Sequence, residues 1–109
     1  MEGSDSGSER YVVAAHVKRG ESGAAEQLLA AGPPFDPDEA GLSAHEAYVG
    51  EDHVYLVFEG KDARNKAFNL ARKHMLEVTR WQNIITDFPA WVEDIPPSAR
   101  RVYSWRAER

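Results

Sequence analysis

The sequence contains no cysteine, and several other familiar features are missing with it. Without cysteine there is no disulfide, no thiolate nucleophile and no cysteine-based metal site, which fits a cytoplasmic protein, our expectation for its location. No run approaches the ~18 consecutive apolar residues of a membrane helix, so we expect no membrane partner. The first residues lack the basic and apolar stretches of a secretory signal.

Positive charge is also in short supply. The chain has 13 Lys and Arg against 18 Asp and Glu, a formal net charge of -5. Nucleic-acid binding needs a dense cationic face, so we expect no nucleic-acid partner. No glycine-rich phosphate loop and no G-x-S-x-G elbow occurs. No cluster of three metal ligands is visible, so we expect no metal.

What remains is an ordinary globular composition, with 42% hydrophobic and 28% charged residues in a chain of 109. This length and composition predict one domain with a modest core. Residues 1–9 are rich in Gly, Ser and acidic side chains and have nothing apolar to bury after Met1, so we expect a disordered tail there. The domain is expected to cover residues 10–106.

The clearest local signal is a β-hairpin. Residues 43–49 and 54–59 alternate with period two, and residues 50–53 between them favour a tight turn. Counting outward from the turn predicts two faces. One face carries the pairs Val49–Val54, Ala47–Leu56 and His45–Phe58, and the other carries Tyr48–Tyr55, Glu46–Val57 and Ala44–Glu59. The second face mixes tyrosines with carboxylates, as a pocket or an interface does.

The rest of the chain predicts further elements around this hairpin. We expect a strand over residues 10–19, a helix from Ser22 to a C-cap at Gly32, a helical region from an N-cap at Asp62 to about residue 86, and a last strand over residues 101–106. The order β-α-β-β-α-β favours a ferredoxin-like α+β sandwich with antiparallel strands ordered 4-1-3-2 and both helices on one face. In that order we expect the first and third strands to be parallel neighbours. The uncovered face predicts a homodimer.

Four short segments carry a resemblance to a known family. They are YVVA at residues 11–14, GPPFDP at 32–37, VFEG at 57–60 and VYSW at 102–105. Over most of residues 10–106 the chain resembles small actinobacterial-type proteins of the dimeric α/β-barrel superfamily. The resemblance implies two protomers packed sheet against sheet, with ligands between sheet and helices or inside the barrel. The superfamily includes cofactor-free monooxygenases, haem-binding and haem-degrading proteins, dye-peroxidase-like enzymes and stress-responsive proteins.

Two histidines are candidates for chemistry. His16 and Glu59 are expected on the same polar face, where they form either an oriented acid/base pair or a structural ion pair. His45 is expected on the apolar face. It is either an axial haem ligand or catalytic base, or a core histidine with one hydrogen bond. Haem is therefore the one cofactor that we consider, and otherwise we expect none.

Aromatic side chains are the other candidates. Tyr48, Tyr55 and Trp105 either line an apolar cavity or act as packing and dimer anchors, and the same alternatives apply to Tyr103, Trp81 and Trp91. The first hypothesis is a small-molecule-binding homodimer with a pocket lined by Tyr48, Tyr55, Trp105, His16 and Glu59. The alternatives are a cofactor-free monooxygenase-like or isomerase-like enzyme on an aromatic substrate, with His45 or His16 as base, and a non-catalytic interaction or stress-response module.

Overall fold

The computed structural model describes residues 8–74, 80–86 and 90–108. Two α-helices, one 3-10 helix and five strands lie in these ranges. Their bounds are β1 (Ser8–His16), α1 (Ser22–Ala30), β2 (Ala44–Val49), β3 (His53–Lys61), α2 (Ala63–Lys73), η1 (Arg80–Asn83), β4 (Ala90–Val92) and β5 (Arg100–Arg106). None of the helices described combines the length and apolar character that crossing a membrane requires.

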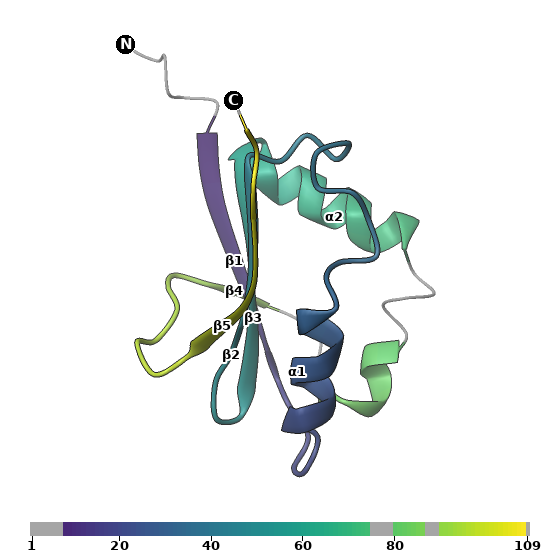
Figure 1. Ribbon diagram of the computed structural model, residues 1–109, viewed down its shortest axis with the longest axis vertical. Helices are drawn as coiled ribbons and strands as arrows, with labels where there is room; N and C mark the ends of the chain where they lie inside the picture. Colours follow the sequence, from purple (N-terminus) through teal and green to yellow (C-terminus); the bar gives the residue numbers. More distant parts are fainter. Residues whose placement is uncertain (1–7, 75–79, 87–89, 109) are drawn as a thin grey trace.

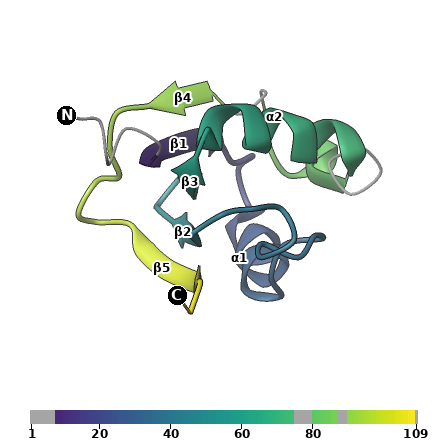
Figure 2. The same cartoon turned by 90° about the horizontal axis from the view of Figure 1, so that it is seen from above.

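The strands form a single sheet with the order β4-β1-β3-β2-β5, and every neighbouring pair is antiparallel. Both helices lie on the same side of this sheet (Figures 1 and 2). The α+β class and the one-sided placement of the helices, both predicted from the sequence, are therefore confirmed. We call the side that carries the helices the helix face, and the other side the open face.

The predicted hairpin is present in the predicted register. Val49 lies opposite Val54, and the pairing continues without a slip to Ala44 opposite Glu59. Alternation over two adjacent strands fixes this register, because a shift of one residue would turn every apolar side chain to the wrong face. The predicted division into two faces is confirmed with it.

The last strand is present but lies at the other edge of the sheet from the one expected. β5 pairs with β2, whereas the short strand β4, which the sequence presents as part of a loop, pairs with β1. The side chains of β5 explain its place. The ring of Tyr103 packs against His45 of β2, and Arg100 forms an ion pair with Glu26 of α1 at 2.8 Å. Both of these partners lie on the β2 side of the sheet.

The expected parallel arrangement of the first and third strands is wrong. β1 and β3 are antiparallel, with His16 opposite His53 and Arg10 opposite Glu59. β2 and β3 are antiparallel as a hairpin, and the crossover through α1 returns the chain in the direction of β1. β3 therefore runs against both of its neighbours, and the two ends of the β1–β3 pair carry different groups.

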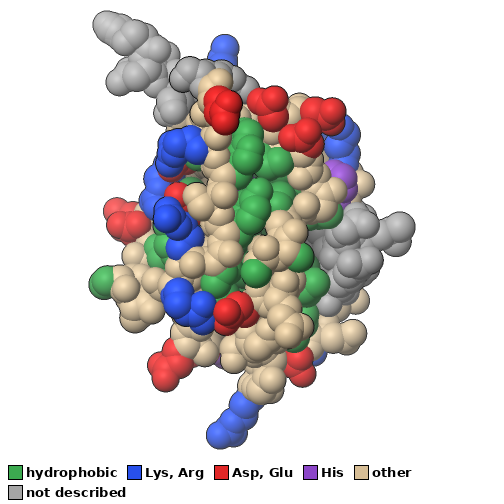
Figure 3. Space-filling view, in the orientation of Figure 1, with side chains coloured by type: hydrophobic (Ala, Val, Ile, Leu, Met, Phe, Trp, Pro, Cys, Tyr) green, Lys and Arg blue, Asp and Glu red, His purple; other side chains and the backbone are tan. Residues whose placement is uncertain are grey.

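The core lies between the sheet and the helices. One cluster gathers around Ala25 and Leu29 of α1, and a second around Leu42, Phe58 and Ala63 at the start of α2. Figure 3 shows hydrophobic side chains in the centre of the view. The helices lie on one side of them, and a column of cationic and acidic side chains runs along the other side.

The open face is crossed by the chain itself. Because β4 and β5 lie at opposite edges, residues 93–99 pass over the strands between them, on the side away from the helices (Figure 1). On this face Val12 is 2% exposed and Val57 is fully buried. The apolar centre of the face is thus buried within one chain, whereas the pattern of the strands predicts that a second protomer covers it.

The N-terminal end of α2 is capped from β1. Asp62, the predicted cap, has φ 58° and ψ 41°, a left-handed conformation, and its side chain does not cap the helix. It accepts instead a hydrogen bond from Asn65 at 2.9 Å. The Arg64 backbone N–H donates to Glu9 at 3.1 Å. β1 begins at Ser8, so Glu9, expected in the disordered tail, belongs to the sheet; residues 1–7 lie outside the described residues.

Candidate ligand-binding site

Four of the six predicted site residues share the open face, as expected. Tyr48 and Tyr55 are opposite each other, and His16 and Glu59 lie on the same side of the sheet. His16 and Glu59 stand at opposite ends of the β1–β3 pair, however. The spacing from Arg10, the partner of Glu59, to His16 is six residues along β1, about 20 Å. The structure therefore does not bring the proposed acid/base pair together.

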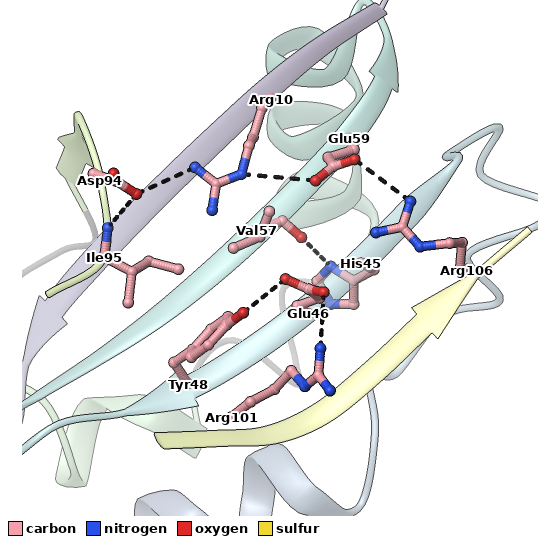
Figure 4. A network of polar contacts seen from close by, with 10 residues as sticks. All are labelled: Arg10, His45, Glu46, Tyr48, Val57, Glu59, Asp94, Ile95, Arg101 and Arg106. Carbon is pink, nitrogen blue, oxygen red and sulfur yellow. Dashed lines mark hydrogen bonds and ion pairs between the residues drawn. The ribbon is translucent and has the colours of Figure 1, made fainter. Parts of the chain in front are cut away.

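Glu59 forms ion pairs with two arginines. Its carboxylate lies 3.6 Å from Arg10 Nε on one side and 3.9 Å from Arg106 Nη1 on the other (Figure 4). Arg10 also lies 3.5 Å from the carboxylate of Asp94, in the segment that crosses the face. These contacts tie β1, β3, β5 and the crossing segment together, so they support the structural alternative for Glu59.

His16 belongs to a cluster at the turn of the hairpin. His53 Nδ1 lies 2.7 Å from Asp52 Oδ1, and His16 Nε2 lies 3.7 Å from Asp52 Oδ2. His16 also contacts the hydroxyl of Thr86 at 3.3 Å. The hydrogen bond from His53 lowers the pKa of Asp52. Within the described residues no three His, Asp or Glu side chains are placed to hold a metal ion.

The two tyrosines of the open face have different surroundings. The Tyr48 hydroxyl donates to Glu46 at 3.0 Å, and Arg101 Nη1 donates to the other oxygen of Glu46 at 3.4 Å (Figure 4). Burial, followed by the hydrogen bond and charge of Glu46, raises the pKa of Tyr48. Burial also raises the pKa of Tyr55, with a smaller contribution from Asp52. Tyr48 is thus part of a polar network.

His45 is a core histidine. It is 3% exposed, and its Nδ1 donates to the Val57 carbonyl at 2.8 Å. The rings of Phe58, Phe35 and Tyr103 have their centres 4.8, 5.4 and 5.8 Å from the centre of the imidazole. Burial lowers the pKa of His45 to about 4, so the ring is neutral at pH 7. Of the two alternatives predicted, the structure favours this one.

The surroundings of His45 do not fit haem. A haem iron needs an imidazole nitrogen with room for a porphyrin beside it. The hydrogen bond from Nδ1 to the Val57 carbonyl is one that an iron-binding histidine also makes, but three aromatic rings surround the imidazole where a porphyrin would have to lie. Trp105 pairs with His45 across β2 and β5, so it lies on the helix face and away from Tyr48 and Tyr55. The predicted pocket of tyrosines and Trp105 is not assembled.

A pocket that sequence reasoning missed lies at the β1 edge of the sheet. It has a volume of about 390 Å³ and is lined by Glu9, Arg10, Tyr11, Arg64 and Trp91, from β1, α2 and β4. We call it the edge pocket. Among the described residues the exposed large hydrophobic side chains are Trp91, 61% exposed and part of its lining, and Phe68, 52% exposed.

Aromatic rings and cations are interleaved around the edge pocket. The Arg64 guanidinium lies 5.7 Å from the centre of the Phe68 ring, and the Phe68 and Tyr11 ring centres are 6.3 Å apart. Arg64 and Phe68 are four residues apart on α2, which puts them on one helix face. That spacing is visible in the sequence, whereas Ala90–Val92 lies in a stretch that the sequence presents as a loop. What joins them to β1 is long-range pairing, which the sequence does not reveal.

A second, larger hollow of about 520 Å³ lies between α2 and the loop that joins α1 to β2, lined by Glu39, Ala40, Lys66, Asn69, Leu70, Arg72 and Lys73. Two of its cations already have partners. Lys66 donates to the Gly41 carbonyl at 2.9 Å, and Arg72 donates to the Asn69 side chain at 3.2 Å. The described residues that line it include no aromatic side chain, so the edge pocket is the better candidate for a specific site.

Comparisons with known proteins add no further guide to this site. No protein-family model, no curated protein and no solved structure matches the chain. The resemblance to the dimeric α/β-barrel superfamily therefore stays an expectation from the sequence. The case for a function rests on the geometry and chemistry of the residues themselves.

Proposed function

We propose that this protein binds small molecules and that its ligand is an aromatic carboxylate held in the edge pocket. One observation carries the proposal. Trp91, an exposed large hydrophobic side chain, lines the same cavity as two arginines. Exposed apolar groups that gather beside a concave surface mark binding sites more often than isolated ones do.

Each half of such a ligand has a complementary partner. An aromatic ring can stack on Trp91 or Tyr11, where offset or edge-to-face contacts add about 0.5–1.5 kcal/mol to area burial. A carboxylate can accept two parallel hydrogen bonds from one guanidinium. Arg64 forms no ion pair with any described residue, and the contacts of Arg10 at 3.5 and 3.6 Å leave several of its N–H groups for a further acceptor.

Among the described residues of the lining, Glu9 carries the one acidic group, and its carboxylate already accepts a hydrogen bond. It accepts the backbone N–H of Arg64 at the start of α2, where the helix dipole favours negative charge. Because the Glu9 carboxylate is hydrogen-bonded to the helix N-terminus, the two guanidinium groups determine the preference of the pocket for an anion. The same engagement makes Glu9 a poor general base, so the pocket supports binding better than catalysis.

Catalysis by the predicted bases has less support. His45 is enclosed by aromatic rings and its Nδ1 is bonded to Val57. His16 lies at the opposite end of β1 from the edge pocket, next to Asp52. A monooxygenase or isomerase that uses either histidine would need a substrate site that the contacts of these side chains do not indicate.

The homodimer is a separate proposal, carried over from the sequence. The homodimer is inferred from the apolar open face. In this chain residues 93–99 already cover part of that face (Figure 1). Tyr55 and the exposed arginines Arg101 and Arg106 remain at the surface of that face, and they are residue types that interfaces favour. The proposed binding at the edge pocket does not invoke the dimer, because the described lining residues all belong to one chain.

Binding is tested by titrating the protein with phenylacetate and with phenylacetamide, the neutral isostere, while following tryptophan fluorescence and heat. We expect saturable binding of the carboxylate and at least tenfold weaker binding of the amide, about 1.4 kcal/mol. Equal affinity for the two probes would show that the arginines do not recognise the charge. Absence of saturable binding for a panel of aromatic carboxylates would overturn the proposal.

Variants locate the site. Trp91→Ala should weaken phenylacetate binding at least tenfold and Arg64→Gln about fivefold, because they remove the stacking surface and a charge. Arg72→Gln is the matched control, since Arg72 lies on the same helix but lines the other hollow. If Arg72→Gln weakens binding as much as Arg64→Gln, the ligand does not occupy the edge pocket.

A further inference from the structure

The lining of the edge pocket shows that it sits at the rim of a strand. Glu9, Arg10 and Tyr11 are consecutive residues of β1. Side chains of consecutive strand residues point to opposite faces of a sheet. A cavity that all three line must therefore wrap around the edge of β1, where the backbone lies between the side chains.

That stretch of backbone lacks a strand on its outer side. β4 pairs with Val12, Val13 and Ala14 and no further, whereas β3 continues along β1 as far as Ser8. In the described part of the chain, no strand pairs with residues 8–11 on the side where β4 ends. An unpaired strand edge presents N–H and C=O groups that are ready to pair with another extended chain.

We propose that the natural ligand of the edge pocket is the carboxyl-terminal end of an extended peptide, which adds to the sheet beside residues 9–11. This inference rests on the proposed function, because it assigns the aromatic ring and the carboxylate of the ligand to the last residue of a peptide. The terminal side chain lies on Trp91, and the terminal carboxylate accepts hydrogen bonds from Arg64 or Arg10. The peptide backbone pairs with β1.

Strand addition explains why cations, aromatic groups and an open edge occur together. In this mode the main chain supplies much of the affinity, and pockets for alternate side chains supply selectivity. The backbone groups of alternate β1 residues face away from β3, so about two residues of β1 can pair with the peptide. A free aromatic carboxylate would use the side chains alone and leave those backbone groups to water.

The experiment compares N-acetylphenylalanine with acetyl-Ala-Ala-Ala-Phe by calorimetry, using the intact protein. We expect the peptide to bind at least tenfold tighter, because it adds backbone hydrogen bonds. Peptides that end in Tyr, Trp or Leu test the last side chain, and the peptide amide tests the carboxylate, with a loss of tenfold or more expected.

N-methylation of single peptide amides gives the sharpest readout. In an added strand only alternate N–H groups point at β1, so methylation should abolish the gain at alternate positions and leave it intact at those between. Amide hydrogen exchange of the protein should slow at either Arg10 or both Glu9 and Tyr11. Arg64→Gln should weaken binding of the free-acid peptide, and Arg72→Gln should leave it unchanged.

The outcomes separate this inference from the function it rests on. If N-acetylphenylalanine and the peptides bind with equal affinity, the site takes small aromatic carboxylates and strand addition is wrong. A gain that is insensitive to the position of the N-methyl group would also overturn it. If no free acid of either kind binds, the proposed function fails together with this inference.

Discussion

His45 and Glu46 are neighbours in β2, and they are the buried polar side chains among the described residues, 3% and 8% exposed. They point to opposite faces of the sheet and meet opposite surroundings. On the helix face His45 lies among aromatic rings with one backbone partner, and burial lowers its pKa to about 4. On the open face Glu46 lies between Tyr48 and Arg101, both of which donate to it.

The two faces therefore differ in how they accommodate a buried titratable side chain. The helix face surrounds the histidine with apolar groups, and burial outweighs the Val57 hydrogen bond and the charge of Glu46, which both raise its pKa, so the histidine is held in its neutral form. The open face supplies donors to a carboxylate, which offset part of its desolvation. The helix face is therefore suited to packing. Binding groups collect on the open face and around the edges of the sheet.

The largest expected effect is a loss of stability in acid that arises from His45 on the helix face. A histidine whose folded pKa lies below its unfolded value contributes full stability above pH 6.5 and loses it as pH falls toward the folded value. With a pKa of about 4 for His45, this residue alone should lower the free energy of unfolding by about 3 kcal/mol between pH 7 and pH 4. Urea unfolding at several pH values measures the loss.

The matched variant is His45→Gln, which keeps an N–H donor for the Val57 carbonyl and removes the titrating ring. Its unfolding free energy should fall less steeply than that of the natural protein over the same range. Parallel pH dependences for the two proteins would mean that His45 takes up no proton on unfolding, and the apolar account of the helix face would be wrong.

A smaller effect is expected for Glu46→Gln on the open face. The substitution keeps the shape and an acceptor for the Tyr48 hydroxyl but removes the charge that faces Arg101, so stability should fall by about 1 kcal/mol at pH 7. The pKa of Tyr48, raised in part by Glu46, should move down. Absorbance titration of the phenol and chemical denaturation measure these two changes. An unchanged Tyr48 titration would contradict the assigned hydrogen bond.

The smallest effect is expected for Glu59→Gln. Its side chain is 25% exposed and its ion pairs are 3.6 and 3.9 Å long, so the loss of stability should stay below about 0.5 kcal/mol. Arg106→Gln is the control and should cost a similar amount. A loss above that of Glu46→Gln would reverse the ranking of the two carboxylates and show that the crossing segment depends on Glu59 through Arg10.

Local sequence signals predicted the local structure well. Alternation around residues 50–53 predicted the hairpin and its register. The predicted end of the first helix is one residue off, because Ala31 is the C-cap of α1 and Gly32, with φ +94°, is the residue after it. These features depend on side-chain period and on a backbone conformation that favours glycine, and both are properties of a few consecutive residues. The division of the hairpin into an apolar face and a polar face followed directly.

Long-range pairing is where prediction from the sequence failed. Nothing near residues 100–106 indicates whether they join β1 or β2, because both edges accept a strand of the same pattern. The choice depends on Tyr103 and Arg100 finding partners in distant elements. The edge pocket was missed for the same reason. Glu9, expected in a tail, meets Arg64 only once α2 has docked on the sheet.

The placement of β5 also determines the order in which the strands can join the sheet during folding. β2 and β3 are joined by a short turn and can pair within microseconds, but the other edge of β2 waits for residues 100–106. During synthesis at about 5–20 residues per second, that edge stays open until the last strand emerges. A chain that stops before Arg100 keeps the edge unpaired and offers it to other chains, a route to aggregation.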